Sequence, residues 1–153
     1  MNSHSDGPDL LASVFPETLL QFPDHGLVID LRKPVDAAAR EGIASIFASS
    51  GRAMSICVIT ADNPNGVVQS DSRNAAAFED LQKAVAAMRV TSVACHGTNA
   101  TLTHRERGLA VKIGPDQGIV LGRKFEQIAI FHFDGEAFWL VPALAEGPAR
   151  RLP

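Results

Sequence analysis

Two apolar segments on either side of Asp134-Gly135 constrain the fold of this chain more than any other sequence feature. Aspartate followed by glycine is typical of a two-residue hairpin turn, because such turns require positive φ angles. The flanking segments, residues 127–133 and 136–141, are apolar at both odd and even positions and include Trp139. We therefore expect a C-terminal β-hairpin whose two faces are both covered by other parts of the molecule.

The preceding sequence alternates between strand-like and helix-like patterns. Apolar, β-branched segments predict strands at residues 26–30, 55–61, 90–95 and 109–113, and we expect the last two to pair. Apolar residues at helical spacing predict helices at residues 35–49, from a cap at Asp71 or Ser72 to Met88, at 115–125, and over a short segment at 9–15. This order predicts an α/β (or α+β) fold with three layers, a mixed sheet and the C-terminal hairpin.

The length of the chain fits one hydrophobic core. A chain of 153 residues is of ordinary single-domain size. Residues 1–8 are small and polar, and residues 146–153 combine glycine, proline and arginine, so we expect both ends to be flexible. The sequence thus predicts a single globular domain over residues 9–145. We expect Gly51 to end the helix that precedes it.

Composition excludes several classes of protein. Hydrophobic residues make up 46% of the chain and charged residues 20%, which excludes general disorder. No apolar run reaches the roughly 18 residues of a membrane-spanning helix. The net charge is −3, so no overall positive field exists to attract nucleic acid or an anionic membrane. We predict a small-molecule ligand, no nucleic-acid partner and no membrane partner, and nothing in the sequence sets the oligomeric state.

The cysteines and the amino terminus indicate a cytoplasmic protein. Cys57 and Cys95 both lie in apolar runs, where a cysteine usually behaves as a small, unreactive hydrophobic residue. The segment Met1–Leu10 lacks the basic start and apolar stretch of a secretory signal. We therefore expect reduced, inert thiols in a cytoplasmic protein.

Loops at the ends of the predicted strands supply the candidate site. The chain lacks the glycine-rich phosphate loops, the serine elbow, the zincin motif and the paired cysteines that identify common active sites. Polar clusters follow the strands at residues 60–64, 96–99 and 103–106 and provide Thr60, Asp62, Asn63 and His96 as candidate binding residues. The alternative is structural: Asp62 and Asn63 would shape a turn, and His96 would bond the backbone.

His104 and Glu106 are the candidate catalytic residues. Side chains two apart in an extended segment project the same way, and a carboxylate beside an imidazole can raise its basicity. The alternative interpretation is a solvated, charged loop. Gln127 is either a structural anchor or a substrate contact, and His132 is expected to be a hydrogen-bonded sheet residue. We predict no cofactor, with a divalent cation such as calcium as the alternative, held by Asp62, Asp71, Glu106 and Asp134 without the spacing of an EF-hand.

Four segments resemble a family of small bacterial proteins, domain of unknown function 3293. They are Val58–Pro64, Asn74 in the following helix, Arg105–Val111 and Phe125–Ile130. The resemblance covers roughly residues 57–140. It implies that the family carries matching residue types at Thr60, Asn63, Pro64, Asn74, Glu106 and Gln127, and it supplies no activity or cofactor. The chain departs from the pattern in a longer polar loop before Glu106, with His104 in place of a nearby aromatic residue.

Two functions from different classes fit these residues. The first is a hydrolase of a small neutral carbonyl compound, such as a lactone, ester or amide. In it Glu106 or His104 activates water, and Asn63, Asn74 or Gln127 polarises the carbonyl. The second is a non-catalytic module that binds a metabolite or a protein. The absence of an established nucleophile or metal motif favours the second.

Overall fold

The computed structural model describes residues 18–48, 54–99, 101 and 103–153. The helix expected at residues 9–15 and the expected cap at Gly51 lie outside these residues. The first sheet has the strand order β2-β1-β5-β6 and comprises β1 (Thr18–Phe22), β2 (Leu27–Asp30), β5 (His96–Asn99) and β6 (Arg105–Glu106). The second sheet has the order β10-β9-β8-β3-β7-β4 and comprises β3 (Ile56–Thr60), β4 (Ser92–Ala94), β7 (Gly108–Val111), β8 (Ala129–Phe133), β9 (Phe138–Pro142) and β10 (Arg150–Arg151).

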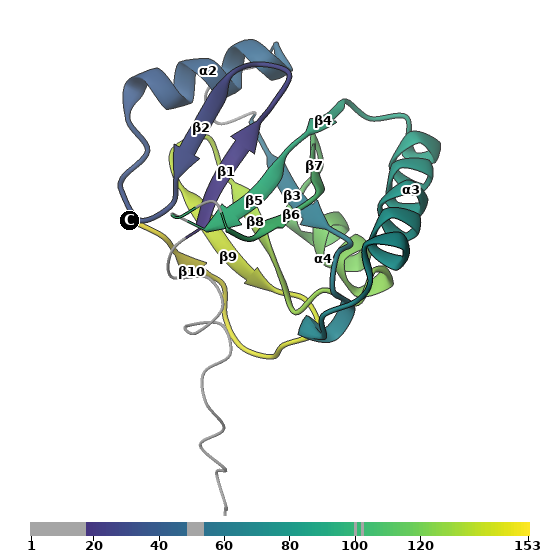
Figure 1. Cartoon of the computed structure of the whole chain (residues 1–153). Helices are drawn as coiled ribbons and strands as arrows, with labels where there is room; N and C mark the ends of the chain where they lie inside the picture. The colour runs from purple at the N-terminus through teal and green to yellow at the C-terminus, as the bar shows by residue number, and fades with distance from the viewer. Residues whose placement is uncertain (1–17, 49–53, 100, 102) are drawn as a thin grey trace, which may run out of the picture.

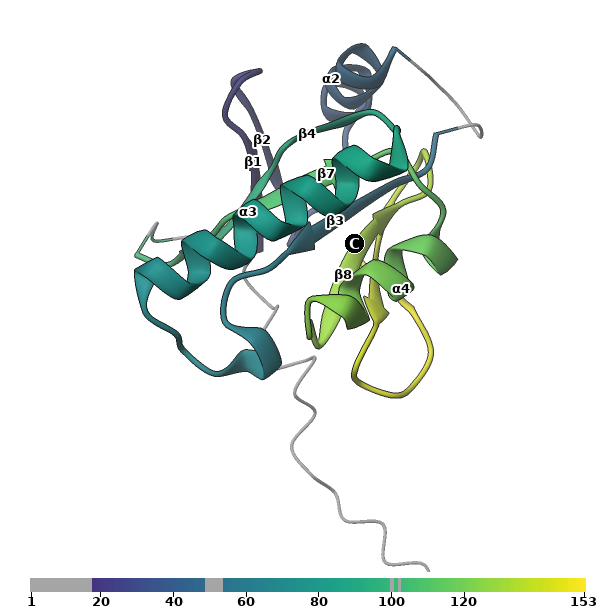
Figure 2. The same ribbon diagram turned by 90° about the vertical axis from the view of Figure 1, so that its right-hand side faces the viewer.

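The described helices and sheets form three layers. Helices α3 (Asp71–Met88) and α4 (Pro115–Lys124) cover one face of the six-stranded sheet, while the four-stranded sheet and α2 (Ala37–Phe47) lie on its other side (Figures 1 and 2). Strand β3 separates two apolar clusters: Ile56 and Val58 pack with the four-stranded sheet and α2, whereas Cys57 and Ile59 pack with α3 and α4. Both faces of this strand are therefore buried.

The α/β class, the three layers and the C-terminal hairpin are confirmed, but the expected mixed sheet needs correction. Every described strand pair is antiparallel. The helices α3 and α4 do join strands that run in the same direction, β3 to β4 and β7 to β8. Each of these connections skips one position in the sheet, because β7 lies between β3 and β4 and β3 lies between β7 and β8. The intervening strand runs the other way, so no parallel pair forms.

The hairpin of β8 and β9 closes through a longer turn than the expected two residues. Phe133 lies opposite Phe138, which leaves residues 134–137 as the connection. The Asp134 carboxylate organises it: Oδ1 accepts hydrogen bonds from the backbone N–H groups of Glu136 (2.8 Å) and Ala137 (2.9 Å), and Oδ2 accepts one from the Trp139 indole (2.8 Å). Aspartate is thus selected here for its side-chain acceptors, and positive φ occurs only at Gly135.

Helix α4 lies close to the six-stranded sheet because two of its residues are glycines. A β-carbon at Gly118 would lie 2.6 Å from the Cys57 Sγ atom, and one at Gly122 would lie 2.8 Å from Ile130. Glycine lowers intrinsic helix stability, but here it permits the contact between helix and strand. The N-cap residue of the helix is Gly114, so no side-chain hydrogen bond caps its first turn.

One two-stranded ribbon belongs to both sheets. Strand β4 continues into β5 through Cys95, and β6 continues into β7 through Arg107, so the ribbon leaves the six-stranded sheet and enters the four-stranded one. The Cys95 N–H donates to the Gly108 carbonyl (3.0 Å) where the ribbon bends. A β-carbon at Gly108 would lie 2.6 Å from the Ile59 carbonyl oxygen, so only glycine fits. We call residues 92–99 and 104–111 the bent ribbon.

The two ends of α2 and the C-terminal segment differ from the sequence predictions. Asp36 caps α2 by accepting a hydrogen bond from the Ala39 N–H (2.8 Å), and the helix ends at Ala48, which has a left-handed φ of 49°. The C-terminal segment, expected as a tail, includes β10, which pairs with β9. Within the described residues, no helix is both long enough and apolar enough to cross a membrane.

Candidate functional site

The loop after β3, the start of α3 and the bent ribbon line an open polar cavity of about 700 Å³. The loop supplies Asp62 and Asn63, the helix supplies Asn74, and the ribbon supplies His104 and two arginines, Arg105 and Arg107. We call this cavity the polar pocket. Segments that lie far apart in the sequence meet here because β3 pairs with β7.

Asn63 and Asn74 form a reciprocal pair at the floor of the pocket. The Asn63 backbone N–H donates to Asn74 Oδ1 (2.9 Å), and Asn74 Nδ2 donates to Asn63 Oδ1 (3.0 Å). Asn63 Oδ1 also accepts a hydrogen bond from the Gln69 N–H (3.0 Å). Asn63 has a left-handed φ of 50°, which asparagine tolerates better than most residues. The pair therefore fixes the loop after β3 onto α3.

Asp62 is a buried carboxylate with incomplete hydrogen bonding. Its Oδ2 atom accepts a hydrogen bond from the Arg107 backbone N–H (3.3 Å) and lies 4.0 Å from the Arg107 guanidinium. Its Oδ1 atom is buried and has no hydrogen-bond partner among the described residues. Burial raises the pKa of Asp62, and Arg107 opposes this shift.

Glu106 and His104 lie beside each other, as their spacing predicts. The Glu106 Oε1 atom is 3.5 Å from His104 Nε2, with the Glu106 side chain 29% exposed and that of His104 58% exposed. Burial raises the pKa of Glu106 above its usual range, His104 and Asn63 lower it, and the Asp62 charge raises it. Asn99 fixes the backbone at His104, since its Oδ1 atom accepts hydrogen bonds from the N–H groups of Thr103 (2.9 Å) and His104 (3.1 Å).

Sequence reasoning missed the two arginines of the pocket, Arg105 and Arg107. They alternate with His104 and Glu106, a pattern that looks like a solvated charged segment. The Arg107 guanidinium instead lies 5.9 Å from the centre of the Phe78 ring on α3, in a cation–π contact that holds the side chain against the protein. The sequence does show an aromatic residue, Phe78, on the helix α3. Only the fold shows that this ring lies beside Arg107.

Gln127 and Thr60 lie behind the pocket and anchor its loop. Gln127 Oε1 accepts a hydrogen bond from the Thr60 hydroxyl (2.9 Å), and Gln127 Nε2 donates to the carbonyls of Asp62 (3.3 Å) and Phe125 (3.1 Å). Both amide hydrogens are therefore used within the protein. Of the two interpretations of Gln127, the geometry supports the structural anchor.

The histidines at positions 96 and 132 lie in the sheets, away from the lining of the polar pocket, with His96 buried and His132 half-buried. His96 Nδ1 accepts a hydrogen bond from the Gly108 N–H (3.4 Å), and His132 Nε2 lies 2.9 Å from the Ser55 hydroxyl, which donates to the Ile113 carbonyl. Burial lowers the pKa of both imidazoles. Burial also raises the pKa of the Cys57 thiol to about 12 and that of Cys95 further, so both thiols stay protonated and unreactive.

The suggested oxygen ligands do not all meet. Asp62 and Asp71 line the pocket, whereas the Asp134 carboxylate is used in the hairpin turn. Within the described residues, no group of three or more histidine, cysteine, aspartate or glutamate side chains is placed to hold a metal ion. The residues described give no preformed cation site.

Comparison with known proteins agrees with the resemblance read from the sequence. Residues 59–130 match a family described as a protein of unknown function, DUF3293. The matched segment begins in β3 and ends in β8, and it includes the Asn63–Asn74 pair, the His104–Glu106 pair and both pocket arginines. Searches of curated proteins and of solved structures found no significant match.

Proposed function

We propose that this chain, whose residues 59–130 match DUF3293, is a hydrolase of a small neutral carbonyl compound such as a lactone, ester or amide. The polar pocket is the proposed active site. The observation that carries the proposal is the His104–Glu106 pair, in which an imidazole that lines the pocket lies 3.5 Å from a largely buried carboxylate. An imidazole held by a carboxylate is a common arrangement for removing a proton from water.

In this proposal His104 is the general base and Glu106 positions it. With Nε2–H directed at Glu106, the Nδ1 atom of His104 accepts a proton from a water molecule. The resulting hydroxide attacks the carbonyl carbon, and negative charge develops on the carbonyl oxygen. The proton on His104 then passes to the departing oxygen or nitrogen as its bond to the carbonyl carbon breaks. A positioned base typically contributes about 10² to 10⁴-fold.

The charges of the pocket suit a neutral polar substrate. Two arginines, Arg105 and Arg107, and two aspartates, Asp62 and Asp71, line the same cavity. A substrate without net charge meets both signs there, and the guanidinium groups can stabilise the oxyanion that forms only during the reaction. The arginines thus take the polarising role that the sequence suggested for Asn63, Asn74 or Gln127.

A second candidate is a non-catalytic module that binds a metabolite or a protein at the same pocket. The observation that favours it is the use of both Asn74 and Gln127 in internal hydrogen bonds, which leaves fewer amide groups to bind a reacting carbonyl. Such a module would bind the same neutral polar compounds without turning them over.

Turnover of a panel of lactones and of 4-nitrophenyl esters distinguishes the two candidates. We expect hydrolysis above the buffer rate, with Glu106→Gln and His104→Gln each lowering turnover by about 10² or more. Glu79→Gln is the matched control, because Glu79 is an exposed glutamate on α3 whose ion pair with Lys83 is 3.6 Å long.

Two results would contradict the hydrolase. The first is hydrolysis that survives in both variants per folded molecule, with folding checked by circular dichroism. The second is an absence of turnover together with a rise in melting temperature on adding the same compounds, which would favour the binding module.

A further inference from the structure

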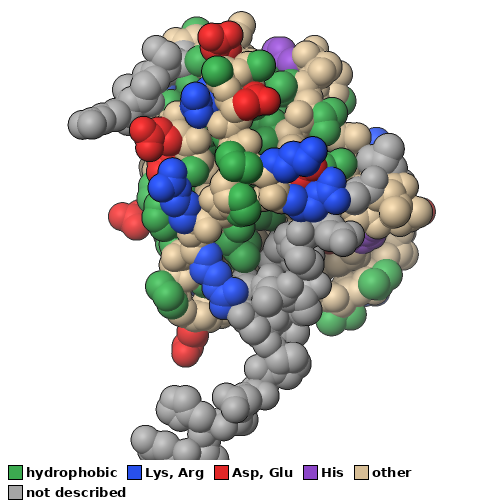
Figure 3. Space-filling view, turned by 90° about the vertical axis from the view of Figure 1, so that its left-hand side faces the viewer, with side chains coloured by type: hydrophobic (Ala, Val, Ile, Leu, Met, Phe, Trp, Pro, Cys, Tyr) green, Lys and Arg blue, Asp and Glu red, His purple; other side chains and the backbone are tan. Residues whose placement is uncertain are grey.

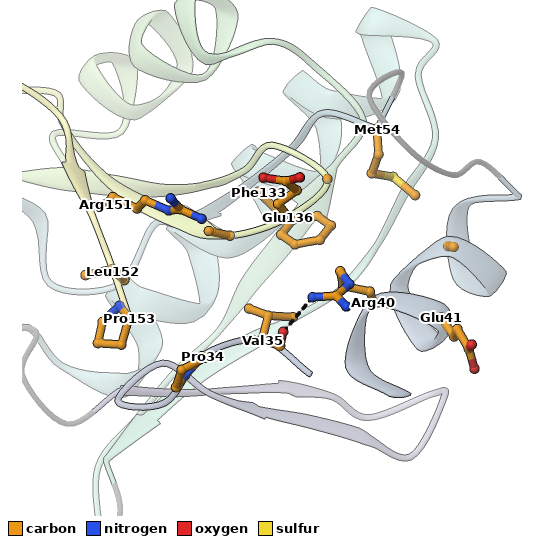
Figure 4. Close-up of a pocket in the computed structure, with 13 residues that line it drawn as sticks. Pro34, Val35, Arg40, Glu41, Met54, Phe133, Glu136, Arg151, Leu152 and Pro153 are labelled. Carbon is orange, nitrogen blue, oxygen red and sulfur yellow. Dashed lines mark hydrogen bonds between the residues drawn. The ribbon is translucent and has the colours of Figure 1, made fainter. Parts of the chain in front are cut away.

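A second cavity, of about 810 Å³, lies on the opposite side of the molecule from α3, between α2, the β8–β9 turn and the C-terminal strand (Figure 4). It takes no part in the proposed hydrolysis. Its size falls within the range of about 300–1,000 Å³ that is common for small-molecule sites. We call it the arginine cavity, after Arg40 and Arg151.

The floor of the arginine cavity is apolar and continuous with the core. Phe133 and Met54 are only 1% and 2% exposed and belong to the larger apolar cluster, and Val35 and Leu152 are partly buried against the same cluster. The Phe133 ring is fixed by the Phe138 ring, with 4.9 Å between the ring centres. These side chains provide a preformed surface for the apolar body of a ligand.

Two arginines from separate elements point into this cavity. Arg40, on α2, donates from one guanidinium nitrogen to the Val35 carbonyl (2.9 Å), which holds the group in place, and Arg151, on β10, extends toward it from the other wall (Figure 4). Within the described residues neither arginine forms an ion pair. The remaining N–H groups of both are therefore available to a ligand.

The acidic residues of the cavity do not neutralise both arginines. Glu41 turns away from them, and Glu136 lies at the rim beside Phe133 (Figure 4). The same face of the molecule shows basic side chains around an apolar area in the space-filling view (Figure 3). Two guanidinium groups above an apolar floor match a ligand with an anionic head and an apolar body, because arginine binds a carboxylate through paired hydrogen bonds.

We propose that the arginine cavity binds an organic carboxylate with an apolar body. This site is independent of the polar pocket and of its proposed reaction. The carboxylate lies between Arg40 and Arg151, and the apolar body packs on Phe133, Met54 and Val35. Glu136, at the rim of the same cavity, adds a negative charge there and weakens the binding of an anion.

The test uses three probes that separate the head from the body: 3-phenylpropanoate, its neutral analogue 3-phenylpropanamide, and acetate. We expect 3-phenylpropanoate to raise the melting temperature of the full chain with increasing dose. Calorimetry should give at least about tenfold weaker binding for the amide and for acetate. Equal binding of the acid and the amide, or no binding of any probe, overturns the proposal.

Variants locate the probe. Arg40→Gln and Arg151→Gln should each raise the dissociation constant of 3-phenylpropanoate about tenfold or more, while Glu136→Gln should lower it. Lys83→Gln, which removes one positive charge on α3, is the matched control and should change nothing. Arg40→Lys provides a charge-conserving variant if Arg40→Gln does not fold. Loss of binding in Arg105→Gln, with binding kept in Arg40→Gln, places the probe in the polar pocket and overturns the proposal.

Discussion

At the scale of single residues, the pairing of Asn63 with Asn74 organises the candidate site. Each of the two hydrogen bonds between these residues satisfies a polar group that is at least partly buried, and Asn74 itself is only 8% exposed. A polar group left unpaired in the interior loses its interaction with water without replacement. The pair therefore matters for stability before any ligand is considered.

Asn74→Ala should lower the free energy of unfolding by about 1–3 kcal/mol, because it leaves the Asn63 N–H without its acceptor. Urea denaturation of the purified variant measures this change. Gln82→Ala, an exposed position on the same helix, should stay within about 0.5 kcal/mol of the wild type. A loss no larger than that of the control would mean that the pair contributes nothing to the fold.

The residue types of the site could be predicted from the sequence, but their partners could not. Turn-forming residues after a buried strand correctly indicated where Asp62 and Asn63 would lie. Whether a side-chain amide is free to bind a ligand depends on atoms from segments distant in the sequence. The Gln127 amide, for example, forms hydrogen bonds with the Thr60 hydroxyl and the Asp62 carbonyl. Spacing alone carries no information about such contacts.

At the scale of elements, the contact between α4 and the six-stranded sheet depends on glycine. Gly118→Ala should destabilise the protein by about 1–3 kcal/mol, because the new methyl group would overlap Cys57 and Ile130. The energetic cost of this overlap exceeds the gain from the higher helix propensity of alanine. Chemical denaturation gives the value. Gly114→Ala is the control, since no atom lies within 4 Å of a β-carbon there.

A second substitution tests the cause of that loss. Cys57→Ala removes the Sγ atom that lies 2.6 Å from the added carbon. The double variant should therefore be more stable than the sum of the two single changes predicts. If the free-energy changes of the two single variants simply add, Gly118 does not act by allowing α4 to approach the sheet closely.

Long periodic elements were predictable, and short polar strands were not. The apolar spacing of α3 and the β-branched run of β3 are strong local signals. In the sequence, β5 and β6 look like polar clusters at strand ends, because His96, Thr98 and Glu106 are not typical strand residues. Two of them, His96 and Thr98, are nevertheless buried. Pairing with β1, which is distant in the sequence, makes β5 a strand.

At the scale of the whole molecule, buried His96 and half-buried His132 should make stability depend on pH. Burial lowers the pKa of His96 and of His132 below the ordinary value of 6.5. The unfolded chain therefore binds more protons than the folded one as the pH falls below about 6.5, and stability should decrease on acidification through this window. Glu106 and Asp62, whose pKa values are raised, act in the opposite direction.

Urea midpoints at about pH 7.5 and about pH 5.5 measure this dependence. His132→Gln removes one of the two groups, so the decrease between the two pH values should be smaller in this variant than in the wild type. The variant also loses the hydrogen bond to Ser55. Because this loss affects its stability at both pH values, it cancels in the difference between them. An unchanged slope would show that His132 is not responsible.

The division of the strands into two sheets could not be predicted from the sequence. Each strand carries a local pattern, but the bend at Gly108 that sends one ribbon into both sheets is a property of three segments packed together. A glycine within an apolar run is compatible with a bulge, a bend or a close approach, and only the neighbouring Ile59 and Cys95 carbonyls decide between them.

The bent ribbon also sets the order in which the chain can mature as the ribosome releases it. Strands β1 and β2 emerge first and can form a hairpin at once, but β1 must then wait for β5, because Leu20 lies opposite Gly97. Until the ribbon has been synthesised, the edge of β1 that later pairs with β5 has no partner, and an unpaired strand edge favours aggregation. A nascent chain stalled before residue 96 should therefore be a client of chaperones, whereas one stalled after the ribbon already has the partner that β1 requires.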